Sequence, residues 1–128
     1  MIICSRHLSL PNFLPILVII SFTTFYLSHF LTDYFDAGGN EFEEEGIPEV
    51  WINHTTLEYL HLRNNRLSGP LPSLLPPLIN IFDIGENEFV GMIPNEWSSH
   101  SSLEHLHVDD NNLKGSLSDF NLPPNLQG

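Results

Sequence analysis

The feature that most constrains the fold of this chain is an eleven-position pattern that recurs four times. In residues 57–67, apolar side chains occupy positions 1, 4, 6 and 11, and asparagine occupies position 9. Further copies begin at residues 79 and 103, and a degraded copy begins at residue 32. The asparagines are Asn40, Asn65, Asn87 and Asn111, separated by 25, 22 and 24 residues. A repeat of this length predicts stacked coils rather than one closed core.

The apolar positions indicate which side of each copy is buried. They point inward from a short strand and the turn after it, and no single copy can bury them alone. Stacking the copies gives a shared core and a parallel sheet. The asparagines would also point inward, as a ladder of amides that satisfies backbone groups of its own turn and the next coil. Gly69, Gly91 and Gly115 stand where this turn requires positive φ.

The pattern LxxLxLxxNxL, extended as LxGxIP, resembles the plant-type leucine-rich repeat (LRR). Residues 62–72 (LRNNRLSGPLP) and 84–94 (IGENEFVGMIP) are similar to that family directly. The resemblance covers residues 31–128 as about four repeats that end at the start of a fifth. It implies an α/β solenoid with a short curved parallel sheet on its concave side, and with turns, 3-10 and extended segments on its convex side. The family's usual capping cysteine pair is missing, because the one cysteine is Cys4.

Residues 1–30 form a different environment. Arg6 is their only charged residue, residues 13–27 are uncharged, and all sixteen acidic residues lie at or after Asp33. Fifteen uncharged, mostly apolar residues fit the hydrophobic region of a secretory signal peptide. No small-residue cleavage pattern follows, so an uncleaved signal anchor over residues 8–27 is the alternative. Both versions predict an apolar N-terminal helix and a repeat portion outside the cytosol, either secreted or at the cell membrane.

In stacked repeats, positions 2, 3, 5, 7 and 8 point outward onto the concave face. Position 3 reads as a contact stripe rich in tyrosine, a residue that anchors many interfaces. Position 5 alternates aspartate with histidine, which predicts binding that changes between about pH 5 and 7. The predicted ligand-binding residues are Tyr34, Asp36, Tyr59, His61, Arg63, Ile81, Asp83, His105, His107 and Asp109.

Charge limits the partners of this face. The formal net charge of −12 argues against nucleic acid, whose phosphates would be repelled. The expected partner is a protein or peptide ligand of basic character or another LRR ectodomain, with wall polysaccharide or a hydrolase as alternatives. His105, His107 and Asp109 have the alternating spacing of metal ligands, but the repeat register already explains their outward direction, so no metal is predicted.

Two further signals concern the loops. Asn53-His54-Thr55 is an N-glycosylation sequon between the first two copies. Trp51 and Trp97 follow corresponding turns and are predicted to lie in the convex-side core.

The sequence carries no signature of a hydrolase, a nucleotide-binding loop, a metalloprotease or a kinase, and no cofactor is predicted. We expect a non-catalytic binding module resembling part of a plant cell-surface receptor ectodomain, acting in signal perception, development or defence. The polygalacturonase-inhibitor branch of the family offers an alternative, a secreted inhibitor of a cell-wall hydrolase. A truncated, non-functional gene product is a third reading.

Overall fold

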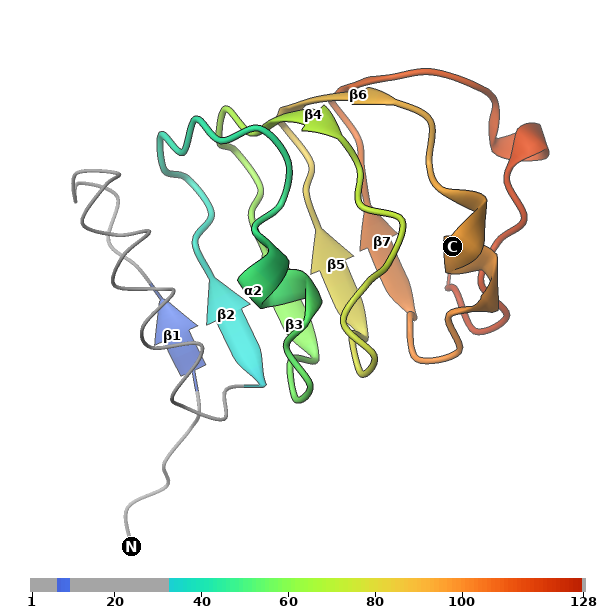
Figure 1. Ribbon diagram of the computed structural model, residues 1–128, viewed down its shortest axis with the longest axis horizontal. Coiled ribbons are helices and arrows are strands. Elements are labelled where there is room, and N and C mark those ends of the chain that lie inside the picture. Colours follow the sequence, from blue (N-terminus) through green and yellow to red (C-terminus); the bar gives the residue numbers. More distant parts are fainter. Residues whose placement is uncertain (1–6, 10–32, 128) are drawn as a thin grey trace, which may run out of the picture.

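The main sheet of the molecule contains five parallel strands (Figure 1). The computed structural model describes residues 7–9 and 33–127. In spatial order the strands are β1 (His7–Ser9), β2 (Tyr34–Asp36), β3 (Tyr59–His61), β5 (Ile81–Asp83) and β7 (His105–His107). The predicted α/β solenoid with a parallel sheet is therefore confirmed.

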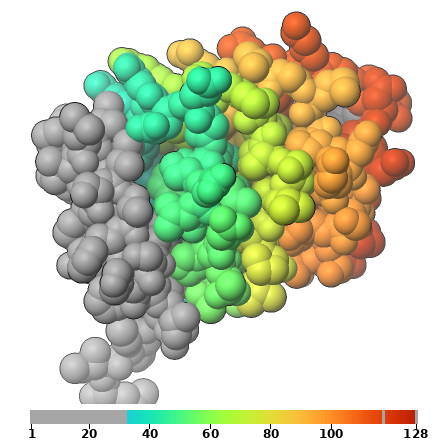
Figure 2. Space-filling view, viewed as in Figure 1, coloured from blue at the N-terminus to red at the C-terminus, as the bar shows by residue number. Residues whose placement is uncertain are grey.

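The strands of the four predicted copies pair in exact repeat register. Position 4 aligns Phe35 with Leu60, Leu60 with Phe82, and Phe82 with Leu106. The copies differ in length by up to three residues, so the loops on the other side of the coil absorb the difference. The colour bands of the space-filling view accordingly follow one another in sequence order along the molecule (Figure 2).

A second parallel sheet, which the sequence did not predict, joins the turns that follow the asparagines. It contains β4 (Ser68–Pro70), β6 (Glu88–Gly91) and β8 (Asn112–Leu113), in that order. An isolated parallel bridge between Glu45 and Ser68 carries the same pairing to the first copy. Because each turn is extended and repeats at the same height of the coil, its free backbone groups meet those of the next turn.

Short helical segments occupy the convex side: α2 (Glu49–Ile52), η1 (Asn95–Ser99) and η2 (Leu117–Asp119). Prolines precede α2 and η1, with φ of −52° and −63°. Trp51 and Trp97 are 4% and 1% exposed, as predicted for convex-side core residues. Trp97 packs on Phe82 with ring centroids 5.7 Å apart, and its indole N–H donates to the Pro72 carbonyl at 3.0 Å.

The core consists of the inward positions of successive copies. In the copies that contain β3 and β5, all four inward side chains are at most 1% exposed. In the copy that contains β7, three of the four are only partly buried. The fully buried set in the two central copies is Leu57, Leu60, Leu62, Leu67, Ile79, Phe82, Ile84 and Phe89.

The first thirty residues are described only at β1. This strand pairs in parallel with β2, His7 opposite Tyr34, which the sequence did not predict. The predicted apolar helix and the uncharged stretch at residues 13–27 lie outside the described residues. Within the part of the chain that is described, no helix has the length and apolar character needed to cross a membrane.

Candidate functional site

The candidate site is the concave face, which we define as the outward-pointing side chains of β2, β3, β5 and β7 and of the residues that flank each strand. The strand residues alternate as half-buried, buried, half-buried in β2, β3 and β5. The central residue of each strand therefore enters the core, while positions 3 and 5 remain available to a partner.

Two tyrosines of the position-3 column form a stacked pair. The rings of Tyr34 and Tyr59 lie with centroids 4.1 Å apart and planes 9° apart. Burial, together with a hydrogen bond with Tyr34, raises the pKa of Tyr59 to about 12. Ile81 and His105 continue this column through the strand register. The pair is a rigid aromatic surface with two hydroxyl groups.

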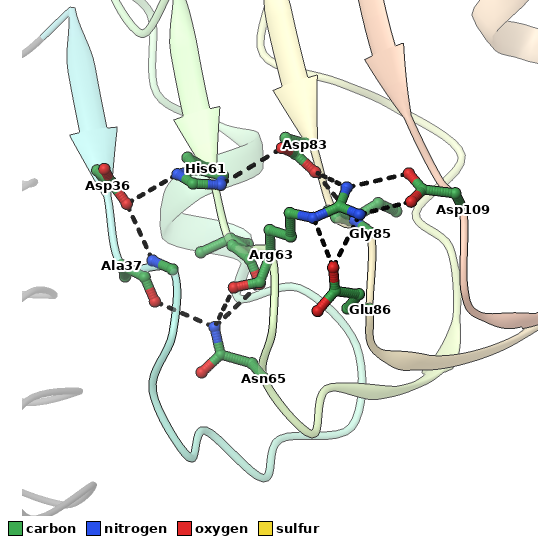
Figure 3. A network of polar contacts seen from close by, with 12 residues as sticks. Asp36, Ala37, His61, Arg63, Asn65, Asp83, Gly85, Glu86 and Asp109 are labelled. Carbon is green, nitrogen blue, oxygen red and sulfur yellow. Dashed lines mark hydrogen bonds and ion pairs between the residues drawn. The ribbon is translucent and has the colours of Figure 1, made fainter. Parts of the chain in front are cut away.

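Histidine and aspartate of the position-5 column meet at the centre of the face (Figure 3). His61 Nδ1 lies 2.9 Å from Asp36 Oδ1, and His61 Nε2 lies 3.3 Å from Asp83 Oδ2. One imidazole therefore bridges carboxylates from the strand on either side of it. The side chains are 25%, 27% and 14% exposed for His61, Asp36 and Asp83, so all three are partly shielded from water.

Arg63 extends this network towards β7. Its guanidinium donates two hydrogen bonds to the carboxylate of Asp109, at 3.0 and 2.6 Å, and a third from Nε to Glu86 at 3.0 Å. These bonds, with that to Asp109 first, raise the pKa of Arg63, and Arg63 in turn lowers the pKa of Asp109. Arg63 Nη1 also lies 3.5 Å from Asp83.

A glycine in the adjacent strand turn makes room for Arg63. A Cβ at Gly85 would lie 2.3 Å from Arg63 Nη1 and 2.9 Å from Asp109 Oδ1. Position 7 of the four copies holds Gly38, Arg63, Gly85 and Asp109, and this role of Gly85 was not predicted. The alternation of glycine with charged residues was the available signal, because neighbouring strands lie only about 4.8 Å apart.

The two histidines of β7 differ from His61. In the strand register, His107 is the partner of Asp83 and His105 is the partner of Ile81. Neither imidazole makes a hydrogen bond or ion pair within residues 33–127. The expectation that each position-5 histidine contacts an aspartate therefore applies to His61 and not to His107, because Arg63 and His61 already occupy the Asp83 carboxylate.

The asparagines lie behind this face, at the turn beneath each strand. Asn87 accepts a hydrogen bond from the Leu67 N–H at 3.0 Å and donates to the carbonyls of Leu62, Ile84 and Gly85. Asn65 and Asn111 make the equivalent bonds in their copies. For Asn40, the bonds within the described residues stay inside its own turn, to Ala37 and Gly38.

The residue before each asparagine adopts a conformation that sequence analysis missed. Gly39, Asn64, Glu86 and Asp110 have φ of 66°, 58°, 52° and 51°. The left-handed turn lets the carbonyl of Glu86 accept from the N–H of Asn65, and that of Asp110 from the N–H of Asn87. The predicted positive φ at Gly69, Gly91 and Gly115 is confirmed, at 77°, 86° and 102°.

Outside the concave face, the described residues form an open pocket but no metal-binding cluster. No group of three or more His, Cys, Asp or Glu within the described residues is arranged to hold a metal ion. An open pocket of about 310 Å³ lies away from the predicted residues, between the β8 turn and η2, and is lined by residues such as Met92, Val108, Leu113 and Phe120.

Comparison with known proteins identifies the repeat. Residues 56–78 match the family model for the Leucine Rich Repeat. Receptor-like protein 18 of Arabidopsis thaliana is 37% identical over 61 residues, which are 48% of this chain and 7% of that protein. The crystal structure of a pollen receptor kinase 3 shares the fold, with a TM-score of 0.61 and 23% identity over 75% of this chain and 44% of that one. The chain thus spans a small part of the first protein and less than half of the second.

Proposed function

We propose that this chain, which carries plant-type leucine-rich repeats and resembles part of a receptor-like protein, is a non-catalytic module that binds a protein or peptide on its concave face. The fold it shares with its relatives is typically non-catalytic and presents a rigid sheet to a partner. Perception of an extracellular signal, in development or defence, is the role we infer for the protein of which this face is a part.

The observation that carries this proposal is the tyrosine pair on the sheet. Stacked Tyr34 and Tyr59 present fixed aromatic area, so a partner that covers them gains contact without ordering flexible side chains. Interfaces concentrate their binding energy in such anchors. His61 packs edge-on against Tyr59, and Arg63 lies two residues further along the same copy. Both add hydrogen-bonding groups that contacts with neighbouring strands hold in place.

The charge of the face favours a basic partner. Arg63 is already bound to Asp109 and Glu86, so its positive charge is neutralised within the face. Glu58 and Asp110 make no ion pair with the described residues. A cationic peptide or the basic surface of another ectodomain would be attracted to these carboxylates, whereas an anionic partner would be repelled.

Binding can be tested with immobilised protein and a panel of cationic peptides, wall polysaccharides and LRR ectodomains. The double variant Tyr34→Ala, Tyr59→Ala should weaken a genuine ligand at least about tenfold, the cost expected for removing two interface anchors. Leu74→Ala is the matched control, because Leu74 is 66% exposed in the loop between β4 and β5. Equal affinity of the double variant and the parent would remove the proposed site. Inhibition of a wall hydrolase in the same panel would favour the inhibitor function instead.

We also propose that the repeat portion lies outside the cytosol and carries a glycan on Asn53. Asn53 and Thr55 are exposed, whereas His54 between them is 9% exposed and anchors the loop. The acceptor amide and the required hydroxyl thus both face solvent next to α2. Expression in a plant secretory system should give a protein whose mass falls on glycosidase treatment, and Asn53→Gln should abolish that change. An unmodified secreted protein would contradict the glycan assignment.

A further inference from the structure

We propose that His61 is a protonation-controlled clasp of the concave face, which bridges Asp36 and Asp83 when its ring is charged and frees one of these carboxylates for a cationic ligand when its ring is neutral. The ligand step rests on the proposed binding function of this face. The clasp itself belongs to the free protein and can be measured without any ligand.

The contacts of His61 suit the charged ring better than the neutral one. Both nitrogens of His61 face carboxylate oxygens, at 2.9 Å from Asp36 and 3.3 Å from Asp83. An ionised carboxylate can only accept a hydrogen bond, and a neutral imidazole carries one N–H and one lone pair. Loss of a proton therefore turns one of the two attractive contacts into a lone pair facing a negative oxygen. One of the two contacts by which His61 joins β2 to β5 is then lost.

The two carboxylates are held in place independently of His61. Asp36 Oδ1 accepts the N–H of Gly38 at 3.0 Å, and Asp83 Oδ1 accepts the N–H of Gly85 at 3.1 Å. Each aspartate is thus fixed by the turn that follows its own strand. A carboxylate that the ring releases therefore remains on the face in the same orientation and can bind an external cation.

The groups that surround His61 do not themselves act as the switch. Asp36 faces it from β2 and Asp83 from β5, while Tyr59 of its own strand packs edge-on with ring centroids 6.2 Å apart. Arg63 lies 3.5 Å from Asp83 and stays charged through the whole physiological range. A Cβ at Gly38 would lie 3.0 Å from His61 Cε1, so the ring packs against that turn where glycine leaves space for it.

The first test follows the imidazole of the free protein by nuclear magnetic resonance. Near about pH 5.5, where histidine is readily protonated, both ring N–H signals of His61 should be observed and slowed in exchange with water. One of the two signals should be lost as the pH is raised to about 8, because the neutral ring keeps a single N–H. Asp36→Asn removes one carboxylate charge and should make the Nδ1–H signal of His61 exchange fast. A His61 ring that shows one protonated nitrogen throughout this range would overturn the clasp.

The second test measures binding of a terminally blocked octalysine peptide, whose charge is constant over this range because lysine titrates near pH 10. Affinity for the parent should rise about fivefold from pH 5.5 to 8, as expected when one partly exposed charge contact is removed. His61→Gln should flatten this dependence. His100→Gln is the control, since His100 follows η1 on the convex side and lies outside the concave face, and it should keep the parental dependence.

The outcomes separate the two proposals. If octalysine fails to bind at any pH while the ring signals behave as stated, the clasp stands and the basic partner is wrong. If binding has the same pH dependence in His61→Gln as in the parent, the control of binding by His61 is wrong while the binding function stands.

Discussion

At the scale of single residues, the ninth-position asparagines provide hydrogen-bond partners for buried backbone groups. Asn87 is 7% exposed and makes one accepted and three donated hydrogen bonds to backbone groups of two copies. These backbone groups belong to residues that lie outside the strands of both sheets. A polar side chain at this buried position is therefore stabilising, because it prevents buried backbone donors and acceptors from remaining unpaired.

We expect Asn87→Ala to lower the free energy of unfolding by about 2–4 kcal/mol. It leaves the Leu67 N–H without its partner and removes one of the two hydrogen bonds to each of the carbonyls of Leu62, Ile84 and Gly85. Urea unfolding measures this loss. The control is Asn112→Ala, an exposed asparagine of β8 whose side chain makes no hydrogen bond in the described structure, with an expected change within about 0.5 kcal/mol. Equal effects at the two positions would contradict the ladder's stabilising role.

At the scale of elements, each three-residue strand is too short to be stable alone and depends on its neighbours. The strands meet through their backbone ladder and through side chains that cross from one to the next. Tyr34 and Tyr59 join β2 to β3, His61 joins β2 to β5, and Arg63 joins β3 to the end of β7. These crossings lie on the concave face, so the binding surface also contributes to the cohesion of the sheet.

The contact between Tyr34 and Tyr59 predicts that the free energy of unfolding depends on pH in the alkaline range. Burial raises the pKa of Tyr59 in the folded state from 10.0 to about 12, so the folded chain favours the neutral phenol. This contribution is fully present below pH 10 and is lost as the pH rises through about 12. The free energy of unfolding of the parent should therefore fall across this window, and Tyr59→Phe should make the fall shallower.

The measurement is urea unfolding at several alkaline pH values, combined with ultraviolet titration of the phenolates. The titration should show one tyrosine ionising late in the parent, and that late step should be absent in Tyr59→Phe. A parent in which every tyrosine ionises near pH 10 would show that Tyr59 is not shielded in solution.

At the scale of the whole molecule, the copies form a nearly one-dimensional array in which each copy packs mainly on its neighbours. The copies of β3 and β5 are covered on both sides by described coils, and their inward residues are at most 1% exposed. The corresponding Leu106 and Val108 of the β7 copy are only partly buried. The same residue type at the same repeat position should therefore contribute more to the free energy of unfolding in the central copies than in the β7 copy.

Leucine-to-alanine substitutions at the same position of two copies test this difference in stability. Leu60→Ala should cost about 2–5 kcal/mol, the range for a leucine removed from a filled core, because Leu60 is 0% exposed. Leu106→Ala, at the same position of β7, should cost at most about half as much, because its side chain is already partly in water. Thermal and urea unfolding of the two variants provide the comparison. Equal losses would show that the β7 copy is as well packed as the centre.

The sequence by itself determined the repeat, the direction of each side chain and the strand register. A period-2 strand sends positions 4 and 6 inward and positions 3 and 5 outward, and a repeat of constant pattern aligns equal positions. The buried tryptophans, the left-handed glycines after each turn and the columns of the concave face follow from the same rule, because each is a local property repeated at a known spacing.

The tertiary structure alone decided which of these outward residues meet. The order of the position-5 column places His61 beside two aspartates and His107 beside one. Among the described residues His61 forms ion pairs and His107 does not, because Arg63 reaches across Gly85 and competes for Asp83. The second sheet and the left-handed Glu86 and Asp110 were likewise invisible in the pattern. Such features depend on distances of a few ångströms between side chains and turns of different copies, and a one-dimensional pattern does not contain those distances.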